Sequence, residues 1–269
     1  MNSVKTNLEF YLPALIELID FSDFPWGKID QSFSKKWEQR TLESNGEKML
    51  IEASIYDIII ETKKGKRQAI GLLDFLNKLF EELNGNLILS EKVLVRSNAK
   101  SMLKAFDSRY LNFVGEMGVL NNMIKSGTYR LSGIEHKLPN GKSVDFKLTQ
   151  TIKNEEILVE IVNIHLDAER VEGNAEAIER FLAHKLTAKM ADKKQKLVED
   201  VAIYLIPVLW GGWEDIQVYS DYFKNNQLAL PFTLEPVAYL QYNDGANYFE
   251  HHFKTVSHLF DREIKKSEN

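Results

Sequence analysis

The chain is 269 residues long, and its 44% hydrophobic and 27% charged residues are ordinary for a globular protein and exclude a disordered or fibrous chain. Its formal net charge of -5 gives no overall attraction for a polyanion, so any nucleic-acid binding has to come from a local basic surface. The absence of cysteine excludes disulfides, thiolate zinc sites and cysteine nucleophiles. The longest apolar runs fall short of the roughly 20 residues of a membrane span. We therefore expect a compact cytoplasmic protein with no membrane partner.

The first part of the chain, residues 1–106, carries no motif that indicates a function. Apolar residues at helical spacing predict a helix over 72–80, which the turn residues of Asn84-Gly85-Asn86 should end. The apolar residues 87–89 then predict a short strand. We expect an N-terminal α+β region of unknown role, followed by a second domain over residues 107–269.

The second part of the chain alternates helical and strand-like patterns. The turn Pro139-Asn140-Gly141 separates two strand-like segments, and Asn-Gly between such segments is the strongest short hairpin signal. Asn174 is a candidate N-cap for a long helix. The expected elements, in chain order, are a helix over 110–124, strands over 128–138, 142–151 and 157–165, a helix over 174–198 and a strand over 201–210.

Two acids stand in strands that the turns should place side by side. Asp145 shares its strand face with Lys147, and Glu160 interrupts an otherwise apolar strand. A buried carboxylate has to be compensated by a metal, a cation or water, although both acids could also simply face solvent. If the three strands pair in sequence, the two carboxylates can hold one hard divalent cation such as Mg²⁺ or Mn²⁺.

A helical acid, Glu116, precedes the two strand acids, and the elements run helix, three strands, helix, strand. Over residues 109–210 this pattern resembles the PD-(D/E)XK nuclease superfamily. The resemblance implies an α/β protein with a restriction-endonuclease-like αβββαβ core, in which a mixed sheet is flanked by helices. It also implies that Glu116, Asp145 and Glu160 are metal ligands.

The chain departs from the superfamily pattern at two positions. Val144 stands where a proline often precedes the first acid, and Val162 stands where the catalytic lysine follows the second acid. Some members of the superfamily draw this lysine from another element, which makes Lys147, Lys185 and Lys189 candidates here. Among them we favour Lys189 over Lys147.

Three lysines, Lys185, Lys189 and Lys193, recur every four residues and should lie on one face of the long helix. One interpretation is a stripe that contacts nucleic-acid phosphates, with an affinity that falls as salt rises. A solvated helix face is an equally good interpretation of the same charges.

The resemblance implies a metal-dependent hydrolase of nucleic acid, and we expect a DNA endonuclease. Many members of the superfamily act as dimers, so a homodimer is one expected assembly. The valine at position 162 supports a different hypothesis, an inactive nuclease-fold module that binds nucleic acid or protein. The two hypotheses differ on metal, because only the enzyme should bind Mg²⁺ or Mn²⁺ and lose it in Asp145→Asn or Glu160→Gln. The choice between DNA and RNA stays open.

Overall fold

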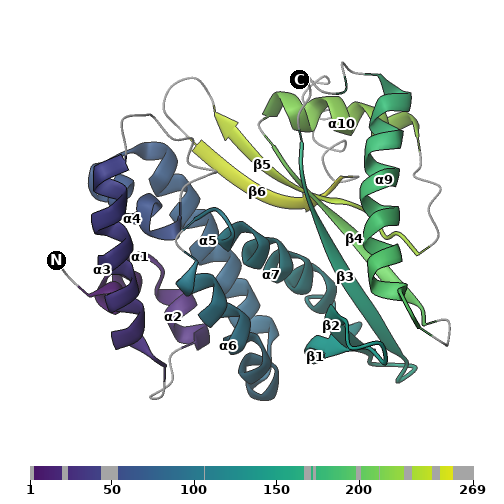
Figure 1. Cartoon of the computed structure of the whole chain (residues 1–269), viewed down its shortest axis with the longest axis horizontal. Coiled ribbons are helices and arrows are strands. Elements are labelled where there is room, and N and C mark those ends of the chain that lie inside the picture. The colour runs from purple at the N-terminus through teal and green to yellow at the C-terminus, as the bar shows by residue number, and fades with distance from the viewer. Residues whose placement is uncertain are drawn as a thin grey trace. The chain divides into compact units, whose positions relative to one another are not determined.

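The computed structural model describes residues 3–19, 24–43, 54–105, 107–166, 171, 174–197, 201–211, 213–226, 232–243 and 249–256. Over these residues the chain is an α/β protein with a mixed, open sheet of six strands (Figure 1). None of the helices described there has the length and apolar character of a membrane span. The chain divides into two compact units, one of residues 1–125 and 243–250 and the other of residues 126–242 and 251–269.

The described elements of residues 1–125 are all helices. They bury apolar side chains against one another, among them Leu8, Leu15, Leu76 and Phe80. Their bounds are α1 (Val4–Tyr11), α2 (Pro13–Ile19), α3 (Trp26–Glu43), α4 (Ile55–Lys63), α5 (Arg67–Asn86), α6 (Leu89–Lys104) and α7 (Tyr110–Ile124).

The strand predicted over residues 87–89 is wrong, and the described part of the N-terminal region is helical rather than α+β. Helix α5 continues through Gly85 to Asn86, and the buried Asn84 side chain donates a hydrogen bond of 2.7 Å to the Ala14 carbonyl. A new helix, α6, then starts at once. Its first turn is fixed by Glu91, whose Oε2 accepts a hydrogen bond of 2.8 Å from the Ile88 N–H.

Helix α7 covers the residues expected for it, 110–124, but it belongs by its contacts to the first compact unit. The division between the units follows Lys125, whereas the sequence led us to place a domain boundary near residue 107. Strands β1 to β4 all lie in the second unit.

The sheet has the strand order β1-β2-β3-β4-β5-β6. Its first three strands pair antiparallel as the hairpin signals predicted, and Gly141 in the first turn has a φ of 82°, which favours glycine. Strand β4 pairs parallel with both β3 and β5. The strand bounds are β1 (Tyr129–Lys137), β2 (Ser143–Gln150), β3 (Glu156–His165), β4 (Ile203–Trp210), β5 (Val237–Asn243) and β6 (Phe249–Thr255).

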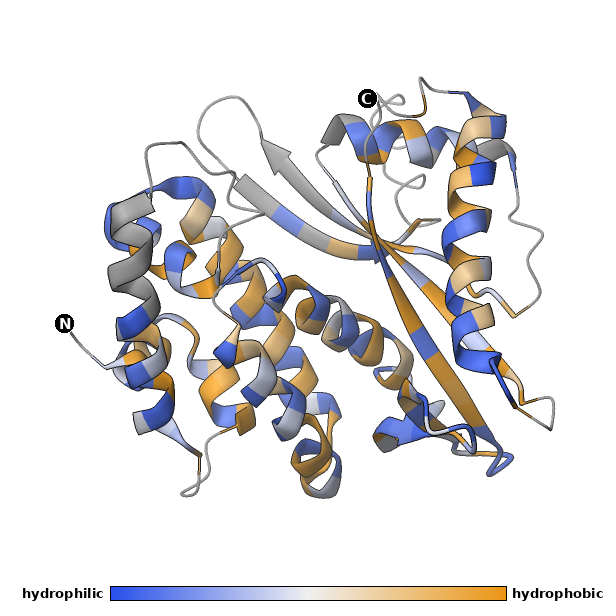
Figure 2. Ribbon diagram, in the orientation of Figure 1, coloured by the Kyte–Doolittle hydropathy of each residue, from blue (hydrophilic) through white to orange (hydrophobic). Residues whose placement is uncertain are grey.

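Helices α9 (Ala175–Lys194) and α10 (Trp213–Asn225) pack on the central strands of this sheet. Both β3 and β4 are mostly hydrophobic in Figure 2, whereas α9 alternates between apolar and polar residues. The shared core contains Val162, Ile164, Leu205 and Leu209 from the strands, Ile178, Leu182 and Leu186 from α9, and Ile216, Tyr219 and Tyr222 from α10. Because the apolar face of α9 lies against β3, the polar residues beside that face lie close to the strand that carries Glu160.

Asn174 is the N-cap of α9, as the sequence predicted, and it accepts hydrogen bonds from the backbone N–H groups of Glu176 (2.9 Å) and Ala177 (3.2 Å). Replacing it by alanine should lower the free energy of unfolding by about 1 kcal/mol, because both N–H groups lose their acceptor. Chemical denaturation measures the difference. Asn174→Ser, which keeps a capping oxygen, is the control and should lose much less; equal losses in the two variants would contradict the cap.

Candidate active site

Asp145 and Glu160 face each other where strands β2 and β3 separate. The antiparallel ladder between these strands runs from Thr149↔Glu156 to Phe146↔Val159 and ends there. One residue further along each strand, the pairing would bring Asp145 opposite Glu160. Opposite residues in an antiparallel pair point to the same face of the sheet, so the register places both carboxylates side by side.

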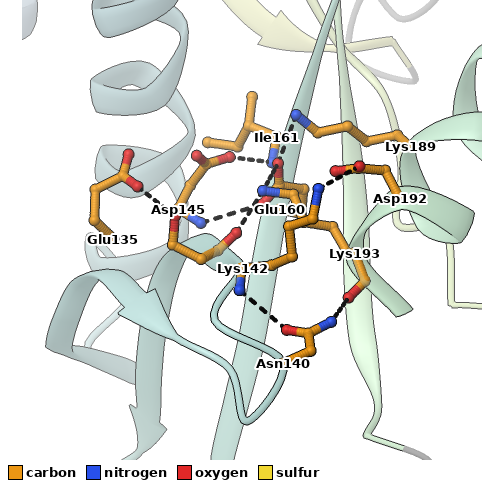
Figure 3. A network of polar contacts seen from close by, with 10 residues as sticks. Glu135, Asn140, Lys142, Asp145, Glu160, Ile161, Lys189, Asp192 and Lys193 are labelled. Carbon is orange, nitrogen blue, oxygen red and sulfur yellow. Dashed lines mark hydrogen bonds and ion pairs between the residues drawn. The ribbon is translucent and has the colours of Figure 1, made fainter. Parts of the chain in front are cut away.

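The two carboxylates take over the hydrogen bonds that the ladder no longer makes. Ile161 N–H donates to Asp145 Oδ2 at 2.6 Å, and Asp145 N–H donates to Glu160 Oε2 at 3.3 Å (Figure 3). Each acid therefore binds the backbone of the neighbouring strand. The end of the ladder between β2 and β3 and the pair of acids therefore occur at the same place, and the acids replace the missing ladder hydrogen bonds.

Glu160 is fully buried, with 0% of its side chain exposed, and two lysines compensate its charge. Lys189 Nζ lies 2.7 Å and Lys193 Nζ lies 2.9 Å from the same oxygen, Glu160 Oε1. Both lysines come from α9 and converge on Glu160 in Figure 3. Pairing of this kind is what allows a carboxylate to stay in an apolar strand, since an isolated buried charge is strongly unfavourable.

The surroundings of Asp145 and Lys189 raise the pKa of both groups, for different reasons. Burial is the main cause that raises the pKa of Asp145 to about 7, and the charge of Glu160 adds to it, while the Ile161 N–H and the lysines offset part of the rise. Partial burial lowers the pKa of Lys189, but the hydrogen bond and charge of Glu160, helped by Asp145, outweigh it and leave the pKa raised. At neutral pH, Lys189 is therefore an ammonium group.

The structure brings together four residues singled out from the sequence, namely Asp145, Glu160, Lys189 and Lys193. The sequence suggested Lys193 only as part of a phosphate-contacting stripe, whereas in the structure it pairs with Glu160. Lys147 is instead engaged by Glu156, with Nζ and Oε1 2.6 Å apart.

Two other predicted site residues, Lys185 and Glu116, contact different residues. Lys185 is exposed, and its Nζ lies 5.9 Å from the centre of the Phe181 ring. Glu116 lies on α7 in the first unit, where its Oε2 accepts a hydrogen bond of 3.4 Å from Asn98. Its role as a metal ligand stays a prediction.

Two features of the site have no signature in the sequence. The Asn140 side chain in the β1–β2 turn donates to the carbonyl groups of Lys193 and Gln195, at 2.8 Å each, and so holds the end of α9. Glu135, on β1, has a φ of 48°, a left-handed conformation that is strained for a residue with a side chain, and its Oε2 accepts a hydrogen bond of 2.8 Å from Ser143. The Asn-Gly dipeptide predicted a hairpin at Asn140, but it did not predict the contact between Asn140 and the end of α9.

Asp145 and Glu160 are the residues of this site that could hold a hard divalent cation. Asp145 Oδ1 makes no hydrogen bond within the described part of the chain, and Glu160 Oε2 accepts only the long bond from Asp145 N–H there. Mg²⁺ is commonly bound by one or two carboxylates, with water and substrate phosphate as further ligands. Among the same residues, no group of three His, Cys, Asp or Glu side chains could hold a metal ion, so two protein carboxylates are the set to consider.

No family model, no curated protein and no solved structure matches the chain. The chemistry of the site has to be derived from its own side chains. These are two carboxylates of unequal burial, with one ammonium group that is partly exposed and one that is mostly enclosed.

The raised pKa of Asp145 predicts how its substitution changes stability with pH. The folded state holds this proton more tightly than the unfolded state, so the contribution of Asp145 to stability is complete below about pH 4 and is lost as the pH rises towards 7. Asp145→Asn removes this loss and keeps an acceptor for Ile161 N–H. From pH 4 to 7.5 its stability should therefore improve relative to the parent by at least about 1 kcal/mol.

Urea denaturation of both proteins in EDTA, at several pH values, measures this change without a contribution from divalent cations. A stability difference that stays constant from pH 4 to 8 would contradict the buried, like-charged environment of Asp145.

Proposed function

We propose that the protein is a metal-dependent phosphodiesterase of nucleic acid, with DNA as the expected substrate. The observation that carries this proposal is the cluster at the opening between β2 and β3, where an ammonium group lies 2.7 Å from one of two adjacent carboxylates. A site that must bind a cation and neutralise a phosphate needs both kinds of charge close together. The described residues of this cluster provide both kinds.

The order and pairing of the elements support the restriction-endonuclease-like core as part of this proposal. Along the chain, α7, β1, β2, β3, α9 and β4 follow one another in the order αβββαβ. Three antiparallel strands are followed by a helix and by a strand that is parallel to the third. The acids lie on the second and third strands, as the resemblance requires.

Each residue of the cluster has a distinct chemical role in this proposal. Asp145 and Glu160 supply the oxygen ligands, and a bound Mg²⁺ or Mn²⁺ would polarise the phosphodiester and activate a water. Lys189 remains protonated because its pKa is raised, so it acts through its charge and its N–H donors rather than as a general base. It is the more exposed of the two ammonium groups, which lets it approach a phosphate oxygen. In this way a helix lysine takes the place of the lysine that Val162 replaces.

A second candidate function rests on the same ion pairs. Because Lys189 and Lys193 both contact Glu160 Oε1, the buried acid is compensated without any metal. A nuclease-fold module that lost its chemistry and binds nucleic acid or protein would keep such pairs to preserve its core. The module should be indifferent to Mg²⁺ and Mn²⁺, whereas the enzyme should depend on one of them.

Cleavage of plasmid, linear and single-stranded DNA, and of RNA, in Mg²⁺ or Mn²⁺ tests the proposal. Asp145→Asn should lower the cleavage rate by at least about 10²-fold through the loss of a metal ligand. Lys189→Met should lower it by about 10²- to 10³-fold, the usual effect of removing one group that stabilises charge in the transition state.

The matched control is Lys153→Met, the same exchange at an exposed lysine in the β2–β3 turn, and it should change the rate less than twofold. If Lys147→Met abolished cleavage while Lys189→Met did not, the assignment of the lysine would be wrong. A folded parent that cleaves none of these substrates with either metal would favour the inactive module.

A further inference from the structure

Lys193, in the last turn of α9, is turned into the protein. Only 12% of its side chain is exposed, compared with 37% for Lys189. Its Nζ lies 2.9 Å from Glu160 Oε1 and also donates a hydrogen bond to the carbonyl oxygen of Ser143. An ammonium group has three N–H donors, so the protein itself uses two of them.

These two contacts connect the parts of the structure on which the candidate site depends. Ser143 is the first residue of β2, two positions before Asp145, and Glu160 lies in the middle of β3. Lys193 therefore spans the place where the ladder between the strands has ended. It fixes the buried carboxylate and the start of the strand that carries the other acid at the same time.

The end of α9 that carries Lys193 is itself held by the β1–β2 turn. Asn140 donates to the carbonyl groups of Lys193 and Gln195. Lys142 Nζ lies 2.7 Å from Asp192 Oδ1 (Figure 3). The ion pair is exposed and contributes little, whereas the two amide hydrogen bonds satisfy carbonyl groups that a helix end leaves without partners. Lys193 and the β1–β2 turn are thus joined by a continuous series of polar contacts.

We propose that Lys193 is a positioning residue that holds Glu160 and the start of β2 in the geometry needed for reaction, and that it does not contact nucleic acid. Among the three lysines spaced four residues apart, Lys185 is the exposed one that suits a phosphate contact. The catalytic half of this inference rests on the proposed nuclease function. The internal half, that Lys193 is a counter-ion of Glu160, does not.

A double-mutant cycle tests the internal half without any activity. Lys193→Met and Glu160→Gln, alone and together, are compared by urea denaturation. Their coupling should change the unfolding equilibrium constant at least tenfold, because the buried carboxylate is one partner. The same cycle with Lys185→Met should give less than a twofold coupling. A coupling below twofold for Lys193 would overturn the inference.

Binding of a fluorescent DNA duplex in EDTA, measured by anisotropy at several salt concentrations, tests the absence of a phosphate contact. Lys193→Met should leave the dependence of affinity on salt unchanged. Lys185→Met should weaken binding and lower the salt slope by about 1, as the loss of one phosphate contact does. A lowered slope in Lys193→Met would overturn the inference.

Steady-state cleavage in Mn²⁺ then separates positioning from a merely structural role. Lys193→Met should lower kcat at least tenfold with KM for DNA unchanged, and Asn140→Ala, which alters no charge, should lower kcat in the same manner but less. Unchanged kcat in a folded Lys193→Met would overturn the positioning role.

If Lys193→Met does not fold, Asn140→Ala and the charge-conserving Lys193→Arg are measured instead. A lowered kcat with unchanged KM in these variants would support the positioning role, and an unchanged kcat would overturn it. A parent without cleavage would refute the proposed function instead, and the cycle and the binding measurement would still decide whether Lys193 is internal.

Discussion

The burial of one negative charge, that of Glu160, is the constraint on which the second unit of this protein depends. The carboxylate lies with no exposed surface in a central strand that is otherwise apolar. Removing such a charge from water is unfavourable by several kcal/mol unless partners compensate it. Two ammonium groups within 3 Å of one of its oxygens provide the compensation, and both come from the same helix.

This requirement determines how α9 lies on the sheet. Its apolar residues Ile178, Leu182 and Leu186 pack on β3 and β4, and the helix must also bring Lys189 and Lys193 above Glu160. The β1–β2 turn holds the end of the helix in this place through Asn140. A pair of carboxylates, a partly exposed ammonium group and an enclosed one are thus consequences of the packing.

Much of the second unit could be predicted from the sequence, because its hydrophobic periods are regular and its turns have distinctive residues. The β2–β3 pairing that brings Asp145 beside Glu160 follows from alternation along the two strands and from the short turn at residues 151–155 that joins them. The first unit was harder: residues 87–89 are apolar enough for a strand, but a hydrogen bond to Glu91 starts a helix there. The roles of Lys193 and Asn140 depend on which helix end meets which turn, and sequence periodicity carries no such information.

Titration of the metal-free protein with Mn²⁺ by isothermal calorimetry tests most directly whether this cluster of charges is a cation site. The account predicts that the parent binds one Mn²⁺ per chain, that Lys153→Met binds it equally well, and that Asp145→Asn weakens binding at least tenfold. A folded parent that binds no Mn²⁺, or an Asp145→Asn variant that binds it as tightly as the parent, would contradict the account. The lysines would then be the only partners that Glu160 needs.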